Sequence, residues 1–295
     1  MKQLTGILLI AISAASFGTL AIFGRFLFAD GVDTFTMLFL RFGLAALLMM
    51  LILFVRKEKF PRGKILLQLI GMGALGYVGQ SFSYLTAIQY ASAGLVALLL
   101  YLYPMFVFIL SVIVLREKTT LIKVAALGLA LTGTALTVDP AGGQVQGIIL
   151  AICAALIYSI YIIVGTNVMK HVSAVQSSAV IFASAGTTYG ILMAVNGVHL
   201  PSTSIGWTNI IGIVLVATVI PVVTFLAGLE RIGPTNASML STLEPVVTVL
   251  LAAWIFEERL KPVVMLGGGL ILVAVILLTR GELGKKASLE VPQPE

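Results

Sequence analysis

The sequence predicts an all-α integral membrane protein with ten transmembrane helices arranged as two inverted five-helix repeats. Three observations predict this fold class. Of the 295 residues, 59% are apolar and only 10% are charged, and the mean hydropathy is +1.11, whereas about a quarter of the residues in a soluble domain are charged. Ten apolar stretches approach or exceed the length that crosses a bilayer. The sequence also matches itself when it is shifted by 141 residues.

The apolar stretches define the predicted spans, because about 20 helical residues cross about 30 Å of hydrocarbon. The first span follows Lys2 and contains small residues that resemble a signal-peptide cleavage site. We expect it to be retained, because the apolar run continues to about Phe28. The predicted spans are 4–28, 34–55, 65–88, 91–115, 121–138, 147–168, 174–195, 207–230, 234–256 and 262–279.

A glycine pattern lies inside the third predicted span. Gly71, Gly73 and Gly76 have the spacing of a dinucleotide-binding turn, but that turn requires a preceding strand and the start of a helix. Within an apolar span these glycines, together with Gly79, instead predict a smooth helix face that a neighbouring helix can approach closely.

The self-similarity divides the chain into two halves. The 141-residue shift aligns Pro104 with Pro245 and Glu117 with Glu258, and both residue types are rare in membrane spans. Because each half contains an odd number of spans, the second half must enter the membrane from the opposite side. The sequence therefore predicts a first repeat at 4–139, a second, inverted repeat at 147–280, and a polar tail at 281–295 whose composition favours disorder.

The basic residues indicate the orientation. With a cytoplasmic N-terminus, most Lys and Arg residues fall in inside segments, and only Arg259 and Lys261 fall outside. Such an excess of positive charge marks the cytoplasmic side. It predicts a multi-pass protein of the bacterial plasma (inner) membrane with both termini cytoplasmic. The net charge of +6 then reflects loop orientation rather than binding to nucleic acid.

Glu244 is the most informative polar residue, because it lies about ten residues into a predicted span of about 23. A carboxylate at that depth is unfavourable unless it faces protein or water. We predict that Glu244 binds a proton or a cation in a translocation path. The structural alternative is a Glu that only forms a hydrogen bond between helices.

Three prolines are predicted hinges: Pro104, Pro221 and Pro245. Pro104 and Pro245 occupy equivalent positions, and each removes a hydrogen bond from the carbonyl four residues earlier, at Leu100 and Ser241. The freed carbonyls could line a substrate site, or neighbouring helices and the Ser241 hydroxyl could satisfy them.

Further polar side chains are candidates for a substrate pocket. Arg41 lies about six residues from the outer end of its span, so it could bind a substrate carboxylate or extend to the interface. A single tyrosine is more often a packing residue, but several of them around Glu244 would form an amphipathic pocket. The predicted substrate-binding residues are Arg41, Gln80, Tyr84, Tyr101, Tyr103, Tyr158, Tyr161 and Ser241.

Several short motifs carry a family pattern: Phe17-Gly18 in the first span, Leu40-Arg41-Phe42 in the second, and the run from Ala93 to Pro104 followed by Arg116-Glu117-Lys118. The last of these has a second copy, from Pro234 to Pro245 followed by Glu257-Glu258-Arg259. Over about residues 4 to 280 this pattern resembles the drug/metabolite transporter superfamily, specifically the EamA-type exporters with two five-helix repeats. The resemblance implies an inner-membrane carrier that exports amino acids, related metabolites or toxic compounds, with proton coupling in some members.

The sequence therefore predicts a transporter, not an enzyme, that exports small metabolites such as amino acids or related amphipathic compounds by alternating access. Its partners would be the small-molecule substrate, the lipid bilayer and protons, in a monomer or homodimer without metal or cofactor. The first alternative is a multidrug exporter for lipophilic cations, with Glu244 as the counter-charge. The second is a membrane-embedded enzyme or receptor, which the lack of a nucleophile, metal or cofactor pattern disfavours.

Overall fold

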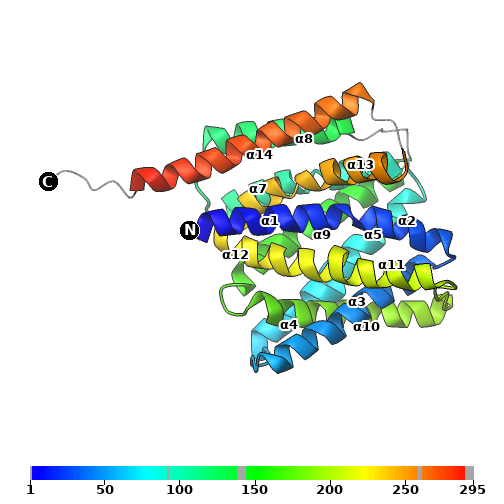
Figure 1. Ribbon diagram of the computed structural model, residues 1–295. Coiled ribbons are helices and arrows are strands. Elements are labelled where there is room, and N and C mark those ends of the chain that lie inside the picture. Colours follow the sequence, from blue (N-terminus) through cyan, green and yellow to red (C-terminus); the bar gives the residue numbers. More distant parts are fainter. Residues whose placement is uncertain (1, 92, 138–143, 258–260, 290–295) are drawn as a thin grey trace.

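The computed structural model describes residues 2–91, 93–137, 144–257 and 261–289. Every regular element in these ranges is a helix (Figure 1). The N-terminal half contains α1 (Lys2–Gly18), α2 (Leu20–Ala29), α3 (Thr34–Val55), α4 (Gly63–Gly71), the π-helix η1 (Met72–Tyr77), α5 (Val78–Ile88), α6 (Ala93–Leu100), α7 (Tyr103–Val114) and α8 (Leu121–Thr137). The C-terminal half contains α9 (Val145–Val168), α10 (Ala174–Asn196), α11 (Ser204–Val214), the π-helix η2 (Leu215–Val219), α12 (Ile220–Leu240), α13 (Leu243–Ile255) and α14 (Pro262–Leu289).

The helices confirm a multi-pass membrane protein. Within the described residues, eight helical stretches are long and apolar enough to cross a membrane, and α8 and α13 are shorter apolar helices. Large apolar side chains such as Phe54 and Leu121 are exposed, as expected where lipid surrounds the bundle.

Three predicted spans are each divided by a short break. The first consists of α1 and α2, separated by Thr19. The fourth span consists of α6 and α7, separated by Tyr101 and Leu102. The ninth begins as the last part of α12 and continues as α13 after Ser241 and Thr242. Gly233, with φ 77° and ψ 170°, bends α12, because glycine adopts positive φ readily and the residue before a proline avoids the helical region. The predicted boundary between the eighth and ninth spans is therefore a kink within α12.

A rare backbone conformation recurs at positions 141 residues apart. Arg116, after α7, has φ 54°, and Glu257, after α13, has φ 56°. Few non-glycine residues adopt positive φ, so the two chain segments leave the bundle through the same kind of turn. The aligned Glu258 and Arg259 lie outside the described residues.

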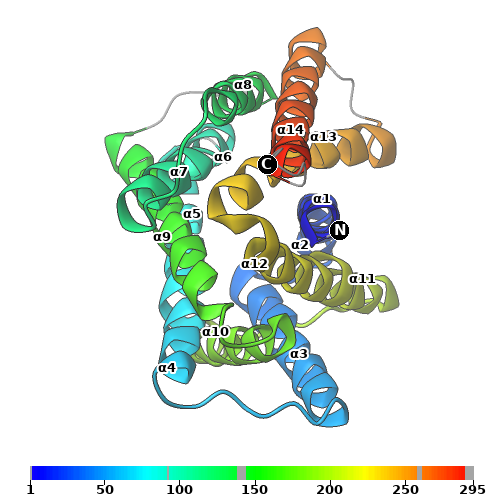
Figure 2. The ribbon, with the colours of Figure 1, turned by 90° about the vertical axis from the view of Figure 1, so that its left-hand side faces the viewer.

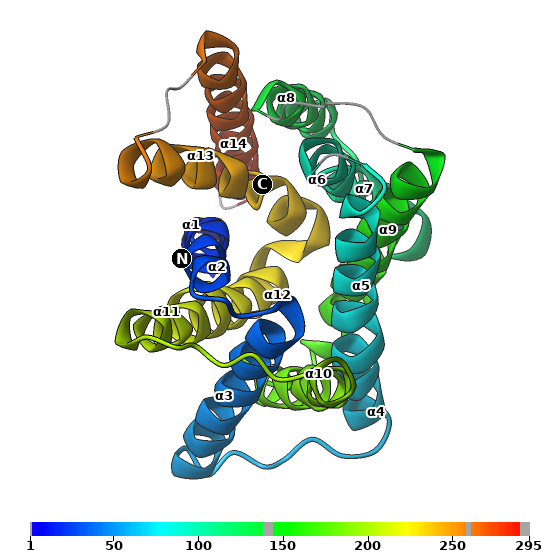
Figure 3. The same cartoon turned by 90° about the vertical axis from the view of Figure 1, so that its right-hand side faces the viewer.

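Four helix pairs place the two halves against each other. α3 packs along α10, α1 along α12, α5 along α9 and α8 along α14. The views along the bundle from its two ends show these pairs arranged around the centre (Figures 2 and 3). Each pair joins one helix of the N-terminal half to one of the C-terminal half, so residues that are far apart in sequence meet in the middle of the bundle.

The C-terminal helix is longer than predicted. The tenth span was expected to end near residue 279 and to be followed by a disordered tail, but α14 continues to Leu289. Glu, Leu, Lys and Ala, which fill much of this segment, are good helix formers and allow an existing helix to extend. Only residues 290–295 of the predicted tail lie outside the described residues.

Candidate functional site

Glu244 lies at the break between α12 and α13, in the first turn of α13. Its amide donates a hydrogen bond to the Ser241 carbonyl at 3.0 Å, so the carbonyl that Pro245 was expected to leave free has a partner. Pro245 does not kink a continuous helix. It belongs to the first turn of a new one, where its missing N–H would have had no helical partner.

Pro104 has the same position in the other half. α6 ends at Leu100, and Pro104 lies in the first turn of α7, which begins at Tyr103. The expectation of a proline inside a continuous helix is therefore wrong here too, for the same physical reason. Pro104 and Pro245 instead each lie in the first turn of a half-helix.

The Glu244 carboxylate lies among residues of several helices. The residue is only partly buried. No described residue donates a hydrogen bond to its carboxylate. Five tyrosines lie within electrostatic range of its charge: Tyr77, Tyr84, Tyr101, Tyr103 and Tyr158.

Aromatic rings form a continuous row from the α6–α7 break to α3. Tyr103 lies 4.8 Å from Tyr158, which lies 5.9 Å from Tyr161, measured between ring centroids. Tyr161 is 5.8 Å from Tyr77, and Tyr77 is 5.0 Å from Phe42. These distances are typical of stabilising edge-to-face and offset contacts. The row provides one aromatic wall beside Glu244.

Arg41 is held at the other end of this row. Its Nε donates to Thr218 Oγ1 at 2.7 Å, and its Nη2 donates to the Ala217 carbonyl at 3.2 Å. Its guanidinium carbon lies 4.8 Å from the Phe42 ring centroid, and its charge lies within electrostatic range of Tyr77. Arg41 is therefore buried among protein partners.

Pro221 explains why the Ala217 carbonyl is available to Arg41. In an α-helix that carbonyl would accept from residue 221, but proline has no N–H. Pro221 follows the π-helix η2, and the chain remains helical through it. The predicted interruption of the eighth span is thus a local π-helical turn, and Arg41 on α3 supplies the donor to the Ala217 carbonyl.

The remaining predicted residues lie around the same centre. Tyr84 is on α5, and Gln80 lies one turn before it on the same helix. Tyr101 lies in the α6–α7 break. The Ser241 hydroxyl donates to the Ala237 carbonyl at 2.9 Å, and the Tyr103 hydroxyl donates to the Ser238 carbonyl at 3.5 Å. Gln80 Oε1 accepts a hydrogen bond from the Ser81 hydroxyl at 3.3 Å.

The sequence reasoning missed Tyr77, Phe42 and Thr218. Tyr77 precedes Gln80 by three residues and Tyr84 by seven, which places all three on one helix face, so its spacing could have identified it. Phe42 follows Arg41 directly but looks like any apolar residue of a span. Thr218 carries no sequence signal, because its contact with Arg41 joins residues 177 positions apart.

The break between α1 and α2 packs directly against Glu244's helix. Thr248 Oγ1 donates to the Gly18 carbonyl and lies equally close to the Glu244 carbonyl, at 3.1 Å in each case. A Cβ at Gly18 would lie 2.9 Å from Val247 Cβ and 3.1 Å from the Glu244 carbonyl oxygen. Only glycine allows this close approach.

At one end of the bundle, Asp33 joins the α2–α3 and α10–α11 loops. It accepts hydrogen bonds from the amides of Phe35 and Thr36, at 2.8 and 3.2 Å, and from the Thr36 hydroxyl, and it lies 3.1 Å from His199 Nδ1. Burial alone raises the pKa of Asp33, but these hydrogen bonds outweigh it and lower the pKa below 3.8. Asp30 similarly accepts from the Ser202 amide at 3.0 Å.

A second polar link lies after α7. Lys123 Nζ is 2.6 Å from Glu117 Oε1, and Glu117 Oε2 accepts from Thr235 Oγ1 at 2.7 Å. Thr235 belongs to the part of α12 beyond the Gly233 kink. Glu117 therefore connects the α7–α8 turn to the half-helix that leads to Glu244.

Comparison with known proteins gives one family. The model of the EamA-like transporter family matches residues 4–139 and 145–280. An uncharacterized transporter of Archaeoglobus fulgidus is 30% identical over 274 residues, covering 92% of this chain and 95% of the relative. The uncharacterized inner membrane transporter YedA of Escherichia coli K12 is 25% identical, covering 93% and 92%. A crystal structure at 20% identity has the same fold, with a TM-score of 0.81 over 93% of this chain and 98% of its own.

Proposed function

Since the chain belongs to the EamA-like transporter family, we propose that it carries small amphipathic metabolites with a cationic amine across the inner membrane by alternating access. One observation carries this proposal: the Glu244 carboxylate accepts no hydrogen bond from the residues that the structure describes, and it lies beside a wall of tyrosines. A carboxylate and aromatic faces together attract an amine that carries an apolar group.

The state of Arg41 supports an amine as the recognised group. Arg41 was an equal candidate for binding a substrate carboxylate, but its guanidinium already donates to Thr218 and to the Ala217 carbonyl. An amino acid would then be held by its amine at Glu244, and its carboxylate would need another partner. This favours amines without a carboxylate, such as lipophilic cations, alongside amino acids.

We further propose that the protein has ten spans in two inverted repeats, at 4–139 and 147–280, with both termini cytoplasmic. The paired proline half-helices and the matching turns at Arg116 and Glu257 support the repeats. The excess of basic residues on one side supports the orientation. In such a fold, tilting of the half-helices around Pro104 and Pro245 opens the centre first to one side and then to the other.

Glu244 also supplies a coupling mechanism. A proton and an amine would compete for the same carboxylate, so the arrival of one would release the other. Exchange of this kind would allow a proton gradient to drive export of the amine.

Flux in proteoliposomes tests the proposal. Purified wild type, Glu244→Gln and the control Glu230→Gln, whose side chain is half exposed, would be compared with labelled amino acids and cationic dyes, with and without a pH gradient. We expect gradient-driven flux of amine substrates in wild type and in Glu230→Gln, and its loss in Glu244→Gln. Gradient-driven flux that persists in Glu244→Gln would exclude the proposed role of Glu244, and flux of neither substrate class in wild type would contradict the substrate assignment.

A further inference from the structure

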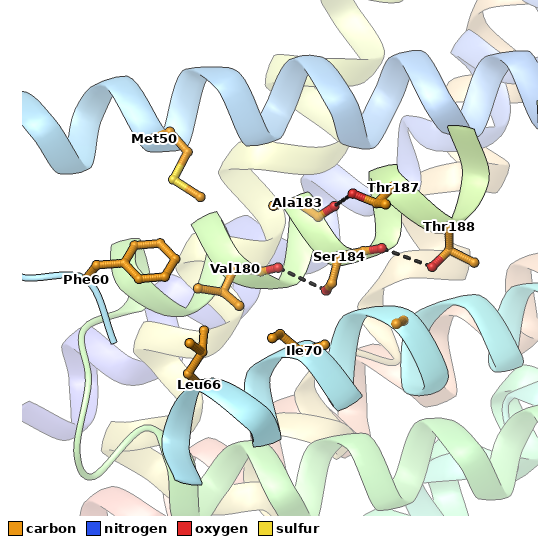
Figure 4. Close-up of a pocket in the computed structure, with 10 residues that line it drawn as sticks. Met50, Phe60, Leu66, Ile70, Val180, Ala183, Ser184, Thr187 and Thr188 are labelled. Carbon is orange, nitrogen blue, oxygen red and sulfur yellow. Dashed lines mark hydrogen bonds between the residues drawn. The ribbon is translucent and has the colours of Figure 1, made fainter. Parts of the chain in front are cut away.

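A hollow lies between α3, α4 and α10 (Figure 4). None of the tyrosines around Glu244 lines it. It has a volume of about 460 Å³. Met50 contributes from α3, Leu66 and Ile70 from α4, and Val180, Ala183 and Thr187 from α10. We call it the α3/α4/α10 cleft.

The cleft has an apolar surface although three hydroxyl residues line it. Ser184, Thr187 and Thr188 each donate to the carbonyl four residues earlier on α10, at 2.9, 2.8 and 3.1 Å (Figure 4). Their donors are therefore used inside the helix. A ligand in this space meets methyl and methylene groups, which suits a hydrocarbon chain rather than a polar metabolite.

The direction of the cleft also fits a hydrocarbon chain. Its α4 side extends from Leu66 to Ala74 of η1, which is eight residues or about 12 Å of helix rise. Phe60, in the loop between α3 and α4, lines the end of the cleft that lies beside this loop. The cleft therefore starts where α3 leaves the membrane and runs inward along the helices, as a lipid chain does.

The α3–α4 loop beside this end of the cleft is strongly basic. Together with the first turn of α4 it contains five basic side chains, all of them exposed: Arg56, Lys57, Lys59, Arg62 and Lys64. The acidic residue among them, Glu58, is 3.7 Å from Arg56 and accepts from the Ser173 hydroxyl at 2.5 Å. Gln176 Nε2 donates to the Lys59 carbonyl at 2.6 Å, so hydrogen bonds to the start of α10 hold the basic loop beside the cleft.

We propose that the α3/α4/α10 cleft and the α3–α4 loop bind one anionic phospholipid, with an acyl chain in the cleft and the phosphate among the loop's basic side chains. The apolar lining accounts for the chain and the local positive charge accounts for the headgroup. Basic clusters beside membrane-spanning helices attract anionic lipids in this way.

Lipid binding can be measured without transport. Native mass spectrometry of the full chain would count bound phosphatidylglycerol and phosphatidylcholine with the same acyl chains. Lys59→Gln/Lys64→Gln removes headgroup charge, and Ala183→Phe fills the cleft. The control Lys2→Gln/Lys118→Gln removes two exposed lysines elsewhere. Size-exclusion profiles would check that each variant is folded.

We expect wild type and the control to retain one phosphatidylglycerol in preference to phosphatidylcholine. Each basic side chain contributes roughly fivefold in affinity, so Lys59→Gln/Lys64→Gln should weaken phosphatidylglycerol binding about 30-fold and leave phosphatidylcholine unchanged. Ala183→Phe should lose the retained lipid of either kind. Equal retention of the two lipids by wild type, or an unchanged preference in Lys59→Gln/Lys64→Gln, would overturn the proposal.

Discussion

Replacing Arg41 by Met tests whether this arginine stabilises the fold or binds substrate. Methionine retains an unbranched apolar stem in place of the methylene groups of arginine, but it removes the donors to Thr218 and the Ala217 carbonyl. A hydrogen bond from a charged donor contributes about 1.5 to 3 kcal/mol, and a buried carbonyl left without a donor costs about 1 to 3 kcal/mol. Because these contributions overlap, we expect Arg41→Met to lower the free energy of unfolding by about 2 to 4 kcal/mol.

The role of Pro221 provides a sharper test. Pro221→Ala restores an N–H that can reach the Ala217 carbonyl, so the carbonyl no longer depends on Arg41. In a double-mutant cycle, Arg41→Met should therefore cost about 1 to 2 kcal/mol less when Pro221 is already Ala.

Unfolding in detergent, titrated with SDS and followed by circular dichroism, measures these differences. Arg56→Met is a suitable control, since this arginine side chain is 61% exposed and lies 3.7 Å from Glu58, and a surface ion pair contributes only about 0 to 1 kcal/mol. If Arg41→Met unfolds like wild type but no longer transports, the structural interpretation is wrong and Arg41 binds the substrate.

Three further changes test other contacts. Glu117→Gln should lower the free energy of unfolding by about 1.5 to 3 kcal/mol, because it removes the charge from the hydrogen bond that Lys123 Nζ donates to Glu117 at 2.6 Å. An unchanged midpoint in the same SDS titration would contradict this. Asp33→Asn should be less stable than wild type at neutral pH. Because hydrogen bonds lower the folded-state pKa of Asp33 below 3.8, this difference in stability should disappear as the pH falls through that lower pKa. Thermal unfolding measured against pH would show this, and a difference that persists at lower pH would exclude ionised Asp33 as its cause. Gly18→Ala should reduce transport at least tenfold relative to Gly24→Ala, where the nearest atom to an added Cβ is 4.0 Å away, and equal flux would show that the close approach is dispensable.

The sequence predicted the helical membrane fold, because apolar length and the rarity of charge determine it residue by residue. It also identified most of the residues that gather around Glu244, since polar groups in a span are few. It could not reveal the short breaks at Tyr101 and Ser241, where apolar composition continues while the backbone turns. Nor could it assign Arg41, whose partners lie in a distant part of the chain and depend on a carbonyl that Pro221 leaves free.

The cross-pairing of α1 with α12 and of α3 with α10 bears on how such a chain originated. Either half alone would expose the helix faces that now lie against the other half. An ancestral five-helix chain with the same faces would have buried them only by pairing with a second copy of itself. Fusion of the two genes would then have allowed the copies to diverge, so that one acquired Glu244 at the position where the other retains Tyr103. The asymmetric centre would thus be a product of duplication, available only once two identical subunits had become one polypeptide.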